Sequence, residues 1–147
     1  MDVVNRPLLR QASKADIPEM SRIRLAVAEN RLRDPGRVSP QMYEDFLERD
    51  GRGWVAQVDG VIVAFSYANR TDGTIWALFV DPAHEGKGLA KVLLGLATRW
   101  LFEIGYPEVK LDTRAGTRAD RFYTRQGWTR TQTDDGNALF SLIRPEP

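Results

Sequence analysis

A glycine-rich loop in the second half of the chain carries the residues best suited to hold an anionic group. Gly86 and Gly88 flank Lys87, and Lys91 lies just beyond the loop, at the start of a long amphipathic stretch. Glycine lets a backbone approach a phosphate closely, and the free N–H groups that begin a helix attract anions. The sequence patterns of dinucleotide-binding and P-loop proteins are both absent. The loop alone therefore predicts a phosphate site, and an ordinary helix start explains it equally well.

The amino-acid composition excludes several kinds of catalytic centre. The 147 residues include no cysteine and a single histidine, His84, which we expect to be a spectator. Cysteine nucleophiles, disulfides and metal sites with several histidines are therefore excluded, and we expect no metal. The net charge of +1 argues against a strongly basic nucleic-acid binder. Residues 87–130 nevertheless carry nine basic and four acidic side chains, which suits an anionic ligand.

The hydrophobic pattern predicts one mixed α/β domain that spans residues 1–147. A strand over 74–80 and a helix over 89–104 would position the loop, and the strand is apolar on both faces, which is typical of a central strand. The complete predicted order is strand 7–11, helices 16–33 and 39–50, strands 54–58, 61–69 and 74–80, helix 89–104, strand 108–113, helix 117–126, and strands 128–133 and 138–143. No apolar stretch is long enough to cross a membrane, so we expect a cytoplasmic protein.

Together with these elements, the loop resembles that of the GNAT superfamily of acyl-CoA-dependent N-acetyltransferases. In that family a strand is followed by an Arg/Gln-x-x-Gly-x-Gly/Ala loop and a long helix. Residues 85–90 read Glu-Gly-Lys-Gly-Leu-Ala here, so that Gly88 and Ala90 match, as does the preceding Val-Asp-Pro of residues 80–82. Glu85 departs from the pattern, because arginine or glutamine is usual at its position. We expect the Glu85 carboxylate to turn toward solvent while the N–H groups of the loop face the phosphates.

A second segment, residues 116–128, resembles the family's Asn-x-x-Ala-x-x-Phe-Tyr-x-x-x-Gly-Phe pattern. Four residues and the aromatic at position 128 agree, namely Ala119, Phe122, Tyr123, Gly127 and Trp128. Gly116 stands where the family has asparagine. The two segments and the order of the elements extend the resemblance from about residue 8 to residue 143. The resemblance implies a twisted, mostly antiparallel central sheet of about seven strands, flanked by four helices.

The resemblance further implies acetyl-CoA as co-substrate. Its pyrophosphate would lie on the N–H groups of residues 86–91, and its pantetheine arm would pair with the backbone of residues 78–80, where an N–H group near Val80 would polarise the thioester carbonyl. The coenzyme-binding residues implied are Leu78, Phe79, Val80, Gly86, Lys87, Gly88, Leu89, Ala90, Lys91, Arg121 and Arg125. For the two arginines, contact with the 3′-phosphate and a solvated helix face are equally supported alternatives.

Two proton transfers are needed for direct attack of an amine on the acetyl group in a ternary complex. The resemblance assigns the acid that protonates the leaving thiolate to Tyr123; the alternative is a packing aromatic. The base that deprotonates the amine is first of all Glu29, with Glu44, Asp81 and Asp112 as alternatives. Any one of these carboxylates is also consistent with a solvated surface group.

We therefore expect an N-acetyltransferase that acts on a primary amine of a small molecule or peptide. A non-catalytic CoA-binding or regulatory domain is the alternative, because Glu85 and Gly116 depart from the family. A nucleic-acid-binding module built on residues 87–130 is weaker, since aromatic residues are few there. Nucleic acid and membrane are not expected as partners, and a homodimer is left open.

Overall fold

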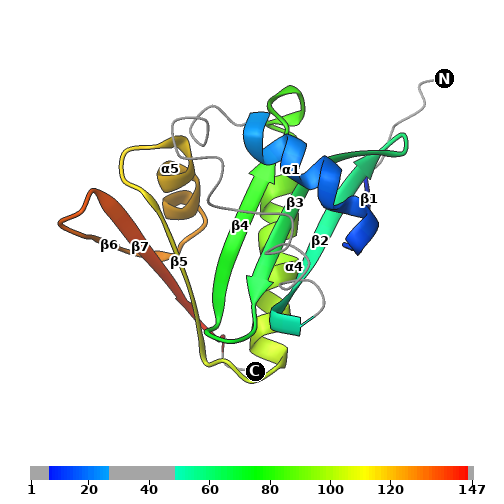
Figure 1. The fold of residues 1–147 in the computed structure, drawn as a ribbon. Helices are drawn as coiled ribbons and strands as arrows, with labels where there is room; N and C mark the ends of the chain where they lie inside the picture. The colour runs from blue at the N-terminus through cyan, green and yellow to red at the C-terminus, as the bar shows by residue number, and fades with distance from the viewer. Residues whose placement is uncertain (1–6, 27–48, 146–147) are drawn as a thin grey trace.

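Seven strands form one sheet in the computed structural model, which describes residues 7–26 and 49–145 (Figure 1). The strands are β1 (Leu8–Gln11), β2 (Gly51–Val58), β3 (Val61–Asn69), β4 (Thr74–Val80), β5 (Glu108–Arg114), β6 (Thr129–Gln132) and β7 (Asn137–Ile143). Their order is β1-β2-β3-β4-β5-β7-β6, and only β4 and β5 pair in parallel. The predicted mixed fold with a mostly antiparallel sheet of seven strands is confirmed.

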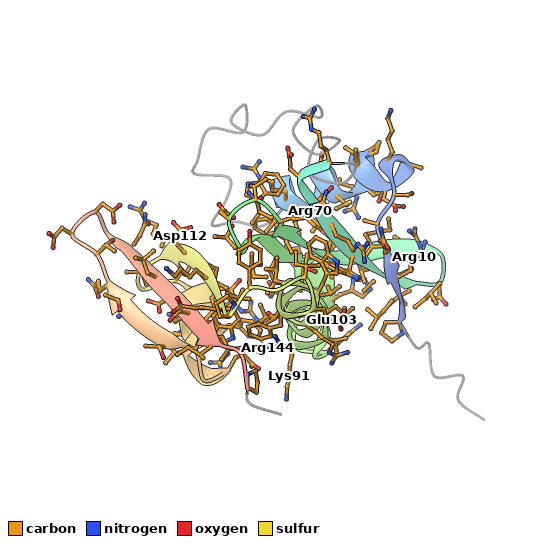
Figure 2. All side chains as sticks on the ribbon, turned by 90° about the horizontal axis from the view of Figure 1, so that it is seen from below. Arg10, Arg70, Lys91, Glu103, Asp112 and Arg144 are labelled. Carbon is orange, nitrogen blue, oxygen red and sulfur yellow. The ribbon has the colours of Figure 1, made fainter. Side chains whose placement is uncertain are left out.

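Three α-helices lie in the described residues, where four were expected for the whole chain. They are α1 (Ile17–Ala26), α4 (Leu89–Glu103) and α5 (Arg118–Arg125), with short 3-10 helices η1 (Lys14–Asp16) and η4 (Pro82–His84). The helix predicted over 39–50 lies outside the described residues except for its last two positions, and so do residues 27–33 of the helix predicted over 16–33. Figures 1 and 2 show α1 and α4 on opposite faces of the sheet.

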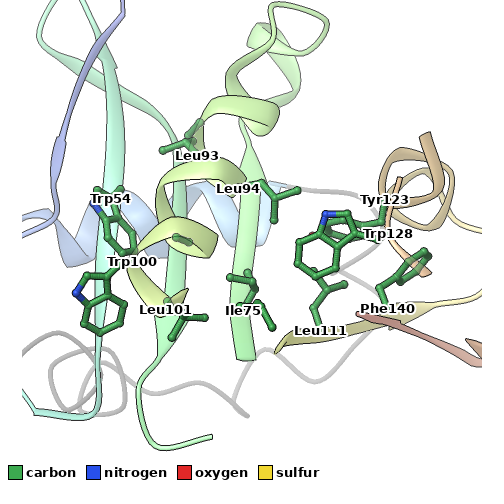
Figure 3. Close-up of a cluster of buried hydrophobic side chains, with 14 of the residues drawn as sticks. Trp54, Ile75, Leu93, Leu94, Trp100, Leu101, Leu111, Tyr123, Trp128 and Phe140 are labelled. Atoms are coloured by element: carbon green, nitrogen blue, oxygen red, sulfur yellow. The ribbon is translucent and has the colours of Figure 1, made fainter. Parts of the chain in front are cut away.

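Each face of the sheet has its own hydrophobic cluster. On the α4 face, Leu93 and Leu101 are fully buried, and Trp54 packs edge-to-face on Trp100 with ring centroids 5.8 Å apart (Figure 3). On the α1 face, Met20 and Ile23 are fully buried in a cluster that includes Phe65 of β3. Because β3 is covered on both faces, it is nearly continuously apolar. The central strands are thus packed between α1 on one face and α4 on the other.

A bulge interrupts β4 near its middle. Tyr67 of β3 pairs with Ala77, but the next residue, Ala68, pairs with Ile75, so Trp76 is an additional residue on β4. Trp76 and Ala77 consequently both pack into the cluster on the α1 face, whereas Ile75 packs into the cluster on the α4 face. A bulge bends a strand and re-aims its side chains. β4 therefore leaves the line of its neighbour β5.

The two halves of the sheet meet at one end only. β4 and β5 share a single registered pair, Thr74 with Lys110, beside which the Lys110 N–H donates to the Gly73 carbonyl at 3.2 Å. The other edge of β5 is paired with β7 along its whole length, from Glu108 to Arg114. Figure 1 shows β4 and β5 diverging from this junction. Among residues 7–26 and 49–145, the edge of β4 is thus left without a strand partner along most of its length.

Candidate active site

A cavity of 770 Å³ occupies the space between β4 and β5. Its walls come from both strands, from the loop between η4 and α4, from α5, and from Arg24 of α1. Side chains directed to either face of the sheet take part: Leu78 and Val80 pack with the α4-side cluster, whereas Trp76 and Phe79 pack with the α1-side cluster. The cavity therefore passes through the sheet from one face to the other.

The backbone of β4 offers hydrogen-bonding groups to this cavity. The Asp81 N–H donates to the Val63 carbonyl of β3 at 2.8 Å, so Asp81 and Val63 form a hydrogen-bonded pair. Phe79 and Phe65, two residues along each strand, then form one as well. Alternate residues of a strand direct their peptide groups to opposite edges. The N–H and C=O groups of Leu78 and Val80 therefore point away from β3 and toward β5. Two of the three β4 residues predicted to bind the coenzyme thus have peptide groups available to a ligand.

The glycine-rich loop begins α4 with its N–H groups open. Gly86 and Gly88 have φ angles of +78° and +81°, which glycine adopts readily, and a Cβ atom at either would meet nothing within 4 Å. Gly88 is the N-cap of α4 and supplies no side chain, so the first-turn N–H groups have no cap acceptor. Of the loop residues predicted to bind the coenzyme, Lys87 alone does not line the cavity; those that do are Gly86, Gly88, Leu89, Ala90 and Lys91.

Glu85, where the sequence departs from its family, is part of an ion pair. Its carboxylate accepts a hydrogen bond from the Arg118 guanidinium on α5, and both residues line the cavity. This differs from the expectation that Glu85 turns alone toward solvent. The physical reason is that α5 places the Arg118 guanidinium beside Glu85 in the cavity wall, so the carboxylate pairs with a cation there. The charge of Glu85 is therefore balanced within the site.

Tyr123 lies on α5 with its ring buried and in the cavity wall. The ring is 6% exposed and packs on Phe122, Phe140 and Trp128, with centroids 5.2, 5.4 and 6.2 Å apart (Figure 3). Burial raises the pKa of the Tyr123 hydroxyl above its usual value, because the phenolate would lose its hydration. The hydroxyl therefore keeps its proton at neutral pH, as a proton donor must. Packing and proton donation are compatible here, since the ring is held while lining the cavity.

A buried ion pair fixes α5 in place, and sequence reasoning missed it. Asp120, 5% exposed, accepts two hydrogen bonds from Arg130 of β6, at 2.7 and 2.8 Å, and a third from the Gly116 N–H at 2.8 Å. These donors, Arg130 first, lower the pKa of Asp120 to about 2. Thr117 caps the helix by accepting from the Asp120 N–H. The Thr-x-x-Asp spacing is a capping signal that the sequence offered; the partner on β6 follows only from the fold.

The α1-side mouth of the cavity carries charged side chains. Because alternate residues of a strand point to opposite faces, and Leu111 faces the α4-side cluster, Asp112 and Arg114 face the α1 side. Both line the cavity together with Arg24. Figure 2, viewed along the strands, shows Asp112 on β5 across the opening from the central strands. Four carboxylates were considered as the base, and two of them, Asp81 and Asp112, lie in the described residues. Of these two, only Asp112 lines the cavity, and its carboxylate has no ion-pair partner in the described residues.

The other candidate bases differ from Asp112. Asp81 accepts from Arg22 at 3.3 Å and from the Ala83 N–H at 3.1 Å, so its carboxylate already has partners. Glu29 and Glu44 lie outside the described residues. The two arginines assigned to the coenzyme also separate: Arg125 lines the cavity, whereas Arg121 does not and donates to the Gly116 carbonyl at 3.2 Å.

His84, expected to be a spectator, lies in the cavity wall, and its Nδ1 atom is buried without a hydrogen-bond partner. Within residues 7–26 and 49–145, no three His, Cys, Asp or Glu side chains gather in a way that could hold a metal ion. No helix in these same ranges has the length and apolar character needed to cross a membrane.

Comparison with known proteins places this arrangement in a family. The fold is similar to that of a PaiA N-acetyltransferase from Thermoplasma acidophilum in complex with coenzyme A, with a TM-score of 0.79 and 16% identity over 94% of this chain and 99% of that one. A GCN5-related N-acetyltransferase from Rhodopseudomonas palustris has a TM-score of 0.80 and 18% identity over 98% and 99% of the two chains.

A sequence relative and a family model complete the comparison. A mycothiol acetyltransferase from Propionibacterium freudenreichii is 29% identical over 105 residues, which are 67% of this chain and 34% of that protein, so this chain matches about a third of its relative's length. The model of the acetyltransferase (GNAT) family matches residues 18–128, most of the chain. The chain therefore belongs to the acetyltransferase (GNAT) family.

Proposed function

We propose that this protein transfers the acetyl group of acetyl-CoA to a primary amine within a ternary complex. The observation that carries the proposal is the cavity through the open sheet, with a phosphate-binding type of loop and Tyr123 on the α4 side and Asp112 on the α1 side. Two substrates that enter from opposite faces would meet between β4 and β5. Direct transfer needs no covalent enzyme intermediate, which suits a chain without cysteine.

The residues present fit two parts of the coenzyme, its anionic pyrophosphate and its long pantetheine arm. The open N–H groups at the start of α4 suit a pyrophosphate, since the space that a Cβ atom would fill at Gly86 and Gly88 is empty. The outward peptide groups of Leu78 and Val80 suit the amides of a pantetheine arm, which would add as a strand to the edge of β4. An N–H group of β4 would then stabilise the negative charge that develops on the thioester oxygen.

The proton transfers can be assigned to the two sides of the cavity. Asp112 accepts the proton that the attacking ammonium must lose, directly or through one water. The amine nitrogen then bonds to the acetyl carbon as the carbon–sulfur bond breaks, and the Tyr123 hydroxyl gives its proton to the departing thiolate. The second proton that the nitrogen loses on becoming an amide passes to solvent, as does the proton held by Asp112. The products are an N-acetyl amide and the free thiol, and Tyr123 is reprotonated from solvent. Glu29 remains the second candidate for the base.

Three further expectations are part of the proposal. We place a single domain over residues 1–147 in the cytoplasm, where acetyl-CoA is available. The acceptor is a small-molecule or peptide amine, as the range of acceptors used by the family suggests. The basic side chains around the coenzyme side, Arg125 among them, support contact with its 3′-phosphate.

The test measures thiol release from acetyl-CoA with a panel of amines, for the parent and for Asp112→Asn. Loss of a base should lower kcat/KM by about 10- to 100-fold while the affinity for acetyl-CoA stays unchanged. The matched control is Glu108→Gln, on the same strand and face but paired with Lys110 and absent from the cavity wall. Glu108→Gln should behave as the parent.

Two outcomes would contradict the proposal in different ways. Thermal stabilisation by acetyl-CoA without thiol release for any amine would indicate a non-catalytic coenzyme-binding domain. Release that is the same in Asp112→Asn and in the parent would remove Asp112 from the mechanism and favour Glu29, to be tested next as Glu29→Gln.

A further inference from the structure

Arg24 is a cation on the acceptor side of the cavity that has no partner in the described residues. It lies on α1, it is half-buried, and it lines the cavity. No ion pair or hydrogen bond of its guanidinium is found within residues 7–26 and 49–145. A partly desolvated guanidinium without an anion is unfavourable, and a ligand carboxylate or phosphate would satisfy its fork of donors.

The neighbouring arginine on the same helix shows what a structural role looks like here. Arg22 bonds Glu19 at 3.1 Å and Asp81 at 3.3 Å, and it does not line the cavity. Its two anions tie α1 to the end of β4. Arg24, two residues on and directed into the cavity wall, makes no such contact with any other described residue. The difference indicates that Arg24 serves something that enters the cavity.

The charges around Arg24 define the chemistry of that ligand. Asp112 and Arg114 line the same side of the cavity, and neither side chain has an ion-pair partner in the described part of the chain. A ligand there meets one carboxylate suited to an ammonium group and guanidinium groups suited to an anion. A simple cationic amine would satisfy Asp112 but would be repelled by Arg24. An amine that also bears a carboxylate satisfies both.

We propose that the acceptor is a zwitterionic amino acid, whose amino group is directed at Asp112 and whose carboxylate is bound by Arg24. This inference rests on the proposed acetyl transfer and names its substrate class. Trp76 and Phe79 of β4 form the apolar part of the same wall, so an apolar side chain on the amino acid fits better than a charged one. Arg24 is thus a specificity-determining residue, and its guanidinium contacts a group of the acceptor that does not react.

The test compares each amino acid with its own carboxamide, which keeps the amine and removes the negative charge. For glycine, alanine, methionine and phenylalanine, and their amides, kcat/KM is measured by thiol release at saturating acetyl-CoA. In the parent the acid should exceed its amide by about 10- to 100-fold, the range expected for a charge-assisted, bidentate contact. In Arg24→Gln this ratio should fall close to one, because the acids lose activity while the amides do not.

Two control variants test whether the ratio of acid to amide depends on Arg24 in particular. Arg22→Gln removes an arginine of the same helix that lies outside the cavity wall, and it should keep the parental ratio of acid to amide. Arg114→Gln removes the other cation of the same side. If Arg114→Gln abolishes the ratio and Arg24→Gln does not, the assignment to Arg24 is overturned.

The remaining outcomes separate this inference from the proposed function. Efficient transfer to the amides, or to diamines and polyamines, with no preference for the acids overturns the amino-acid acceptor and leaves the acetyltransferase intact. Binding of acetyl-CoA without transfer to any acid of the panel overturns it as well. A weaker affinity of Arg24→Gln for acetyl-CoA, measured by calorimetry, with an unchanged ratio would assign Arg24 to the coenzyme instead. Failure of the parent to bind acetyl-CoA at all would overturn the proposed function itself.

Discussion

The two sides of the cavity that we assign to the coenzyme and to the acceptor offer different kinds of binding group. On the coenzyme side the available groups are backbone N–H groups, set by a helix start, two glycines with positive φ and an unpaired strand edge. On the acceptor side they are the side chains of Arg24, Asp112 and Arg114. Backbone recognition survives most substitutions, whereas side-chain recognition changes with each one.

This difference is one reason why the fold is retained at low sequence identity. A structure with 16% identity still superposes with a TM-score of 0.79, because the sheet, the loop and the helix start depend on pattern and glycine more than on particular side chains. A family motif can therefore name the coenzyme, while the acceptor must be inferred from the charges of the individual chain.

The strongest test of backbone recognition is Gly88→Glu. We expect acetyl-CoA binding to weaken by more than about 100-fold, because a side chain and a negative charge would enter the space beside the open N–H groups. Calorimetric titration measures the affinity. The matched control is Gly136→Glu, which has a similar φ of +87° and equally open surroundings in the β6–β7 turn, away from the cavity. Equal binding by the two variants would show that the loop is not the phosphate site.

Tyr123→Phe is the next largest expected effect, since we propose Tyr123 as the proton donor on the coenzyme side. The variant keeps the packed ring and removes the proton, so kcat should fall by about 10- to 1000-fold while the affinity for acetyl-CoA is retained. Steady-state kinetics combined with coenzyme titration separates the two quantities. If kcat stays at the parental value, Tyr123 is a packing residue and the thiolate is protonated by another group.

Asp120→Asn tests whether the coenzyme side needs its buried ion pair for support. The native pKa of Asp120 is about 2, below the 3.8 of the free carboxyl, so Asp120 stabilises the folded state above pH 4 and loses this effect as the pH falls toward 2. At pH 7 the variant should lose about 2 kcal/mol of unfolding free energy. The difference from the parent should shrink as the solution is acidified.

Thermal unfolding followed between pH 2 and pH 7 measures this difference. Asp112→Asn is the control from the acceptor side, and its melting temperature should stay near that of the parent, because Asp112 is exposed. A difference between Asp120→Asn and the parent that does not depend on pH would show that the ion pair is not the source of the stability.

Glu85→Gln is the smallest expected effect. Removing a carboxylate beside the phosphate loop, and freeing the Arg118 guanidinium from it, should tighten acetyl-CoA binding by about two- to five-fold at low salt. The gain should shrink as salt screens the charges. Titrations at two salt concentrations test both statements. Weaker binding would mean that Glu85 positions Arg118, and the departure from the family pattern would then be a working part of the site.

The fold was predictable from the sequence wherever local signals were strong. β3 and β4 begin and end at the predicted residues, because the Asp59-Gly60 turn and the Thr71–Gly73 turn delimit them. The predicted start of β2 was wrong, because the strand begins at Gly51, three residues earlier than predicted. Gly51 pairs with Asn69 of β3, and this pairing outweighs the poor strand propensity of glycine.

The parts of the site that could not be predicted all depend on contacts between distant elements. The bulge at Trp76 arises from the register between β3 and β4, which has no local signature in an apolar run. The Glu85–Arg118 and Asp120–Arg130 pairs depend on where α5 docks. The place of Arg24 in the cavity wall depends on how α1 packs on the sheet, and the sequence of the helix alone does not show it.

Among the described residues, the sheet consists of two leaves whose strands pair with each other only at Thr74 and Lys110. One leaf is the ribbon β1–β4 between its two helices, and the other is the ribbon β5–β7–β6 with α5 clamped to it through Asp120 and Arg130. Backbone hydrogen bonds join the strands of a leaf along their length, whereas the two leaves are joined by strand pairing at one end and by the hydrophobic cluster beneath α4. A ligand that bonds both leaves would therefore add hydrogen bonds along the open edge of β4, and would fix Tyr123 and Asp112, which both lie on the second leaf, relative to the peptide groups of β4.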